Sequence, residues 1–167
     1  GVLEMIRSYE EYRKQFPGHS EKLVLCGQRL WNFDSPFKAA RQSLFSQDIL
    51  FTGYVTEREL ENWYQHSSLT AIPSLYEGFG LPVLEAMRAK APILIHEAKA
   101  LSEVGGNLVY KTDIKNPEAT AKIIHRLLSG EIQSLDRSPE YQRHRQSFTW
   151  SHCAKETFNV YRKVLSL

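Results

Sequence analysis

The sequence predicts an α/β domain built on a doubly wound parallel sheet that helices cover on both faces. Short apolar runs of strand length alternate along the chain with longer segments whose apolar residues recur at helical spacing. The short runs are almost wholly apolar, which is typical of strands buried on both faces. With 167 residues, 42% of them hydrophobic and 24% charged, the chain has the size and composition of one globular domain.

The predicted helices lie between start and stop signals. Pro17-Gly18 ends the first helix, and Thr56 with Glu59 has the spacing of a capping box at a later one. Other helices are expected to begin at Ser35, Pro82 and Asn116. The residues expected to face inward from these helices are Val2, Ile6, Tyr9 and Phe16; Phe37, Ala40 and Leu44; Leu60, Trp63 and Tyr64; and Ala119, Ile123, Leu127 and Leu128.

Two further segments complete the helical part of the prediction. Residues 134–145 are polar and charged, and we expect the cluster Arg143-His144-Arg145 to form a solvated helix face, with a contact to anionic lipid headgroups as the weaker alternative. A final amphipathic helix is marked by Ala154, Phe158, Tyr161 and Leu165.

Five strands are expected, over residues 23–27, 49–52, 69–72, 92–95 and 108–110. Ligands in open α/β sheets bind outside the carboxyl ends of the strands. The segments that follow the strands, namely Gly27, residues 53–55 and residues 73–80, are therefore the candidates for a binding site.

The stretch 77–87, Glu-Gly-Phe-Gly-Leu-Pro-Val-Leu-Glu-Ala-Met, predicts a glycine turn followed by a helix start. Gly78 and Gly80 permit a tight backbone path and close approach of a ligand, and Pro82 suits a first helical turn. A helix that opens behind glycines presents free N–H groups and a positive dipole end, which favour phosphate. Glu77 is then expected in the loop and Glu85 in the first helical turn. A plain turn with two solvated glutamates fits the same residues.

Residues 77–87 also resemble the glutamate–seven residues–glutamate signature of retaining glycosyltransferases of family 4. The resemblance continues upstream at residues 49–56, 59–60 and 64 and downstream at residues 91–95, 103–107 and 148–151, and so covers nearly the whole chain. It implies the GT-B fold, in which two Rossmann-like domains enclose the active site. Residues 1–167 would be the single C-terminal, donor-binding domain, without its first strand and without the N-terminal acceptor domain.

The resemblance implies roles for the candidate residues. Glu77 is expected to be the catalytic residue, Glu85 to accept the ribose hydroxyls, and the Phe79-Gly80-Leu81 turn to bind the diphosphate. The donor-binding residues are Gly27, Gly53, Tyr54, Val55, Gly78, Phe79, Gly80, Leu81 and Glu85. The main chain of residues 53–55 would hold the nucleotide base, while the Tyr54 ring is expected to pack.

The implied partners are a nucleotide-sugar donor, a glycan or lipid-linked acceptor and the missing N-terminal domain. No metal or other cofactor is expected, and the sequence has no Asp-x-Asp motif. A net charge of +2 does not indicate nucleic-acid binding. Cys26 and Cys153, far apart in the sequence, fit a reducing cytosol. We expect a cytoplasmic location, including the inner face of a membrane, with any membrane contact made by the absent domain.

Other functions are weighed against this one. The main alternative is a non-catalytic Rossmann-like module that binds nucleotides or proteins. A dinucleotide oxidoreductase is disfavoured because the third glycine of its fingerprint is absent. A glycosidase pair is disfavoured because a phosphate-type turn between two carboxylates would serve no purpose. Without its first strand and its acceptor domain the chain is expected to bind donor weakly or not at all, and not to turn over. Lys90, where the family often has glycine, is expected to be a surface change on the helix.

Overall fold

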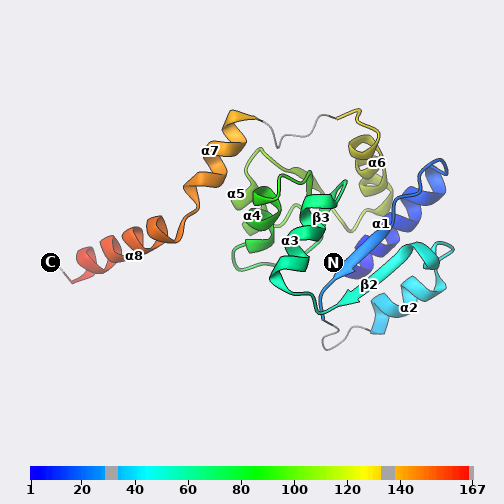
Figure 1. The fold of residues 1–167 in the computed structure, drawn as a ribbon, viewed down its shortest axis with the longest axis horizontal. Helices are drawn as coiled ribbons and strands as arrows, with labels where there is room; N and C mark the ends of the chain where they lie inside the picture. The colour runs from blue at the N-terminus through cyan, green and yellow to red at the C-terminus, as the bar shows by residue number, and fades with distance from the viewer. Residues whose placement is uncertain (29–33, 133–137, 166–167) are drawn as a thin grey trace.

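The computed structural model describes residues 1–28, 34–132 and 138–165. Parallel strands alternate with helices, which confirms the predicted α/β class (Figure 1). The strands are β1 (Leu23–Cys26), β2 (Ile49–Gly53), β3 (Thr70–Ile72), β4 (Ile93–His96) and β5 (Tyr110–Thr112). The helices are α1 (Val2–Gln15), α2 (Asp34–Gln42), the 3₁₀ turn η1 (Ser46–Asp48), α3 (Glu57–His66), α4 (Leu81–Arg88), α5 (Lys99–Gly105), α6 (Pro117–Leu128), α7 (Pro139–Ser147) and α8 (Trp150–Val164).

The parallel strands form two sheets with an interruption between β1 and β3. β1 pairs with β2, and β4 lies between β3 and β5. Among the described residues, β1 and β3 each keep one edge without a partner strand. A cavity of about 690 Å³ lies between these edges and is lined by both strands and by residues of α1, α3 and α6.

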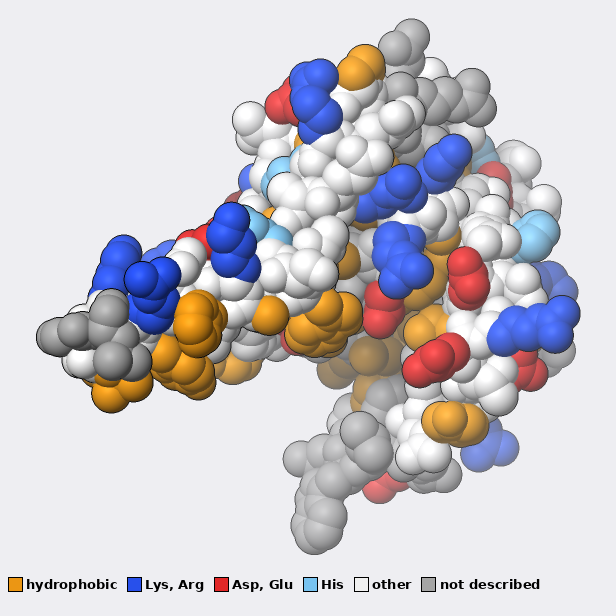
Figure 2. All heavy atoms as spheres, turned by 60° about the vertical axis from the view of Figure 1, so that its left-hand side comes forward, with side chains coloured by type: hydrophobic (Ala, Val, Ile, Leu, Met, Phe, Trp, Pro, Cys, Tyr) orange, Lys and Arg blue, Asp and Glu red, His pale blue; other side chains and the backbone are white. Residues whose placement is uncertain are grey.

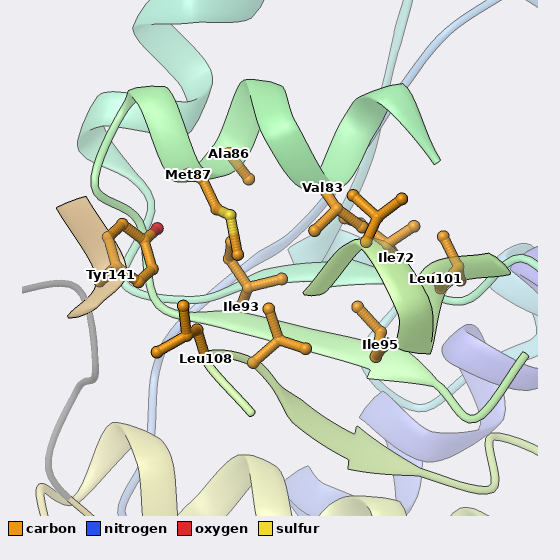
Figure 3. Packing of buried hydrophobic residues seen from close by; sticks show 11 residues of the cluster. Ile72, Val83, Ala86, Met87, Ile93, Ile95, Leu101, Leu108 and Tyr141 are labelled. Carbon is orange, nitrogen blue, oxygen red and sulfur yellow. The ribbon is translucent and has the colours of Figure 1, made fainter. Parts of the chain in front are cut away.

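Helices cover both faces of the three-stranded sheet, as a doubly wound fold requires. Ile93 and Ile95 of β4 belong to one core cluster, which α4, α5 and α7 complete. Leu94, which points to the opposite face, belongs to the other cluster, with α1 and α6. Figure 3 shows Val83, Ala86 and Met87 directed from α4 toward β4. This packing fixes the height and direction of α4 above the sheet.

Several start and stop signals act as predicted. The Thr56 side chain accepts a hydrogen bond from the N–H of Glu59, whose carboxylate accepts from the N–H of Thr56, so the capping box forms. The Asn116 side chain caps α6 through the N–H of Ala119. Gly130 follows α6 with φ +77°, as a helix-stopping glycine does.

The structure corrects four expectations about elements and packing. Leu44 is 79% exposed because α2 ends at Gln42, before a further turn could carry it inward. Trp63 is 41% exposed on α3. Helix α5 was not expected, because no helix was predicted between the strand at 92–95 and the strand at 108–110. The last strand begins at Tyr110, so Leu108 and Val109 are buried in the connection before it.

Helix α8 projects from the body of the domain, and none of its residues is buried (Figure 1). Figure 2 shows hydrophobic side chains along one side of this projection and Lys and Arg side chains on the other. Phe158, Tyr161 and Leu165 are 60%, 59% and 65% exposed. The amphipathic helix is confirmed, but its apolar side does not cover the core. In the part of the chain that the structure describes, no helix has the length and apolar character needed to cross a membrane.

Candidate functional site

The first two candidate turns meet at the carboxyl ends of β1 and β2. Gly27 has φ +137° and Gly53 has φ +71°, which are conformations that glycine adopts more readily than other residues. The N–H of Gly27 donates to the carbonyl oxygen of Gly53 at 3.1 Å. This bond holds the two turns together at one edge of the sheet.

The third candidate turn forms the start of α4. Gly80 is the N-cap residue, with φ +110° and ψ +42°, and its carbonyl accepts from the N–H of Val83 at 3.0 Å. A Cβ on Gly80 would lie 3.1 Å from Cδ2 of Leu101. Gly78 does not have a positive φ, and a Cβ there would meet no atom within 4 Å. The positive φ at position 80 therefore favours glycine there. At position 78 the backbone does not favour glycine, and the space that a side chain would occupy is open.

The α4 start offers main-chain donors. Within the described residues, no hydrogen bond to another residue is recorded for the N–H groups of Gly78, Phe79, Gly80 or Leu81. The first N–H groups of a helix lack partners in the helix itself and carry partial positive charge. Such a turn can bind an anion.

The two signature glutamates differ in their surroundings. Glu77 lies in the loop and is partly buried, and its carboxylate has no hydrogen bond or ion pair recorded within the described ranges. Glu85 is exposed on α4, and its Oε2 accepts a hydrogen bond from the Tyr64 hydroxyl at 3.1 Å. The sequence had suggested that Glu85 lies in the first helical turn. Because α4 begins at Leu81, Glu85 lies in the second turn instead.

Sequence reasoning assigned Tyr64 to the core alone and missed its contact with Glu85. The ring does pack against the core cluster beneath α4, while the hydroxyl reaches the carboxylate. Burial, followed by the nearby charge of Glu85 and the hydrogen bond to it, raises the pKa of Tyr64 well above its usual value. The phenol is therefore protonated at neutral pH and acts as a hydrogen-bond donor. No local pattern links residues on two different helices, so the sequence carried no signal for this pair.

The Tyr54 ring is 71% exposed, which corrects the expectation that it packs. It follows Gly53 at the rim of the site, beside the partly buried Val55. The cavity between β1 and β3 reaches Gly27, Tyr64 and Glu85. It does not include Glu77, residues 53–55 or residues 78–81, which lie on the more open surface at the same edge of the sheet.

The segment after residue 137 also contacts the site. The Phe148 ring meets the Phe79 ring in a T-shaped arrangement. His144 Nε2 lies 2.7 Å from the carbonyl oxygen of Val104, and Tyr141 is buried. The expectation of a solvated face is therefore wrong for His144, whereas Arg143 is exposed. Residues 133–137 of the same polar segment lie outside the described ranges.

Lys90 is not on the helix, which corrects its expected place. α4 ends at Arg88, and Lys90 has φ +59°, the one positive φ recorded for a non-glycine residue in the described ranges. The backbone at this position turns out of the helix in the left-handed conformation that glycine adopts at low cost. This conformation explains why glycine is frequent there in the family that the sequence resembles.

The domain has the architecture of one half of a GT-B glycosyltransferase, with the turn 77–81 and both glutamates at the carboxyl edge of the sheet. The family model described as "Glycosyl transferases group 1" matches residues 1–145, and the chain belongs to this family.

Sequence relatives agree with this assignment, and a solved structure agrees with the fold. The O-antigen chain mannosyltransferase B of Escherichia coli is 29% identical over 96% of this chain and 42% of its own length. An uncharacterized glycosyltransferase of Methanocaldococcus jannaschii is 32% identical over 100% of this chain and 43% of its own length. The structure of Anabaena HepE in complex with UDP is similar in fold, with a TM-score of 0.74 at 18% identity over 98% of this chain and 44% of that one. The chain thus spans less than half the length of these relatives.

Proposed function

We propose that this chain is the donor-binding domain of a retaining glycosyltransferase of the family 4 type. The observation that carries the proposal is the turn 77–81 at the start of α4, where the N–H groups of residues 78–81 have no recorded partner among the described residues and Glu77 and Glu85 lie on either side along the chain. A nucleotide-sugar has an anionic diphosphate, a ribose diol and sugar hydroxyls, and the turn offers a partner of the right chemistry for each. A non-catalytic module would not need both glutamates around an intact anion-binding turn.

Each part of the donor has a proposed partner. The diphosphate accepts hydrogen bonds from the N–H groups of residues 79–81, where the helix dipole adds a favourable field. The base lies against the main chain of residues 53–55, near Gly27. Glu85 accepts from the ribose hydroxyls.

Glu77 is the proposed catalytic residue. Its carboxylate has no recorded partner in the described part of the chain, so it is free to accept from sugar hydroxyls. A carboxylate near the anomeric carbon also favours positive charge that develops there in the transition state. Sugar transfer would go to a glycan or lipid-linked acceptor, bound by a second domain. Because the named relative from E. coli is a mannosyltransferase, a GDP- or UDP-hexose, mannose first, is the donor class to test.

The interrupted sheet bears on how this domain works. β1 and β3 expose facing edges across the 690 Å³ cavity, and a Cβ at Gly1 would overlap the carbonyl of Pro73, just after β3. Gly1 therefore lies at the carboxyl edge of the sheet. A parallel strand between β1 and β3 would end at this edge, where α1 begins. We propose that such a strand, N-terminal to α1, completes the sheet and the floor of the site.

The test is to titrate UDP, GDP and ADP into the polypeptide that the whole gene encodes and to measure binding by NMR or calorimetry. Saturable binding of one nucleotide that Glu85→Ala abolishes, and that Glu118→Ala on α6 leaves unchanged, supports the proposal. Absence of binding to every nucleotide supports the non-catalytic module. With an active enzyme, Glu77→Gln should lower turnover far more than donor affinity, and equal losses in both would count against a catalytic Glu77.

A further inference from the structure

The contact between Tyr64 and Glu85 joins α3 to α4, and both residues line the cavity. Glu85 is exposed, so its carboxylate would sample several rotamers without a restraint. Tyr64 is held in place, because its ring packs against the core cluster under α4 and α3 is anchored by its capping box. A fixed phenol thus donates to a carboxylate on the neighbouring helix.

The geometry leaves part of the carboxylate available. The Tyr64 hydroxyl uses one lone pair of Oε2. No partner is recorded for Oε1 among the described residues. An ionised carboxylate has two oxygens and about four acceptor sites, so Oε1 and the second lone pair of Oε2 can still accept two hydroxyl groups. The arrangement suits a vicinal diol, whose two hydroxyls are both donors.

We propose that Tyr64 is a positioning residue that holds the Glu85 carboxylate in the orientation needed to accept from the ribose diol of the nucleotide. The inference rests on the proposed function, because it concerns the same donor site. Ordering a flexible side chain before the ligand arrives lowers the entropy lost on binding. The restraint should therefore increase affinity for a diol and leave contacts to the base and phosphates unchanged.

The experiment compares a ribonucleoside diphosphate with its 2′,3′-dideoxy counterpart, using the polypeptide that the whole gene encodes. The unsubstituted protein should bind the ribonucleotide more tightly. Tyr64→Phe keeps the packed ring and removes the hydroxyl, and it should weaken ribonucleotide binding about three- to tenfold while leaving the affinity for the dideoxynucleotide unchanged. In a Glu85→Ala background, Tyr64→Phe should have no further effect. Tyr161→Phe, on the exposed side of α8, is the matched control.

The outcomes separate this inference from the proposed function. Equal weakening of both nucleotides by Tyr64→Phe, or independent effects of Tyr64→Phe and Glu85→Ala, would overturn the positioning role and leave donor binding intact. Unchanged ribonucleotide affinity in Tyr64→Phe would overturn it also. Failure of the unsubstituted protein to bind either nucleotide would overturn the proposed function, and the inference with it. Thermal unfolding of each variant shows whether a loss of affinity reflects a loss of folded protein.

Discussion

The ring of Phe148 contacts the ring of Phe79 edge to face, with their centroids 6.2 Å apart. Phe79 belongs to the turn that starts α4, whereas Phe148 follows α7. α7 is itself held to the domain by buried Tyr141 and by the contact between His144 and Val104. The segment after residue 137 therefore supports the turn 77–81 from outside.

Removing the Phe148 ring should loosen this turn. We expect Phe148→Ala to weaken nucleotide binding several-fold, because the turn must then be ordered when the ligand binds. Phe158→Ala is the control, since Phe158 is 60% exposed on α8. Calorimetric titration of both variants measures the effect, and equal affinities in the two would show that the ring contact does not support the turn.

The two signature glycines should respond differently to a methyl group. Gly80→Ala forces a side chain into a positive-φ conformation next to Leu101, and we expect a loss of about 1–3 kcal/mol in the free energy of unfolding. Gly78→Ala meets open space, so stability should be unchanged while nucleotide affinity falls, because the methyl group occupies space on the ligand side. Denaturant unfolding and nucleotide titration of the two variants test this prediction. Normal nucleotide binding by Gly78→Ala would contradict the proposed close approach of the ligand to the main chain at Gly78.

The sequence was sufficient for the fold class, for the first four strands and for the place of the signature turn. These features depend on local patterns, such as the apolar run of β4 between Pro92 and Glu97 or the capping box at Thr56. The Tyr64–Glu85 bond depends on how two helices are set side by side by tertiary packing. The same limit applies to Leu44 and Trp63, whose spacing matched an inward face although α2 ends early and α3 carries no buried residue.

Lys90 provides a stability test that does not involve the site. Its φ of +59° disfavours any residue with a Cβ. Lys90→Gly should therefore raise the free energy of unfolding by about 1 kcal/mol. Lys90→Ala keeps the Cβ and removes the charge, so it should leave stability nearly unchanged. If alanine stabilises as much as glycine, the lysine charge rather than the backbone conformation is the cause.

The capping box of α3 should make stability depend on pH. Hydrogen bonds from the Thr56 N–H and then from its hydroxyl lower the pKa of the Glu59 carboxyl below its ordinary value of 4.5. A group whose pKa is lower in the folded state stabilises the fold above its unfolded pKa, and this stabilisation is lost as the pH falls through the folded pKa.

Glu59→Gln is the matched variant, because glutamine keeps a hydrogen-bonding group and does not titrate. The unsubstituted chain should be the more stable of the two at pH 7, and their melting temperatures should converge as the pH falls below 4.5. A difference that stays constant down to pH 3 would mean that the ionised carboxylate is not what stabilises the start of α3.

The features that sequence patterns could not supply are concentrated where distant segments meet. The contact of Phe148 with Phe79 joins residues far apart in the chain. The gap between β1 and β3 concerns which strands pair, and apolar runs alone do not specify strand pairing. The projection of α8 is likewise a matter of packing, since an amphipathic pattern predicts an apolar side but not what covers it.

The most direct test of a donor site at the turn 77–81 is a two-dimensional ¹H–¹⁵N NMR titration with a nucleoside diphosphate. We predict that the largest shift changes occur at the main-chain N–H groups of Gly78, Phe79, Gly80 and Leu81, with smaller ones at residues 53–55, and that inorganic diphosphate reproduces the first set alone. Shifts confined to other surfaces, or unchanged signals for residues 78–81 at saturation, would contradict the assignment of this turn as the diphosphate site.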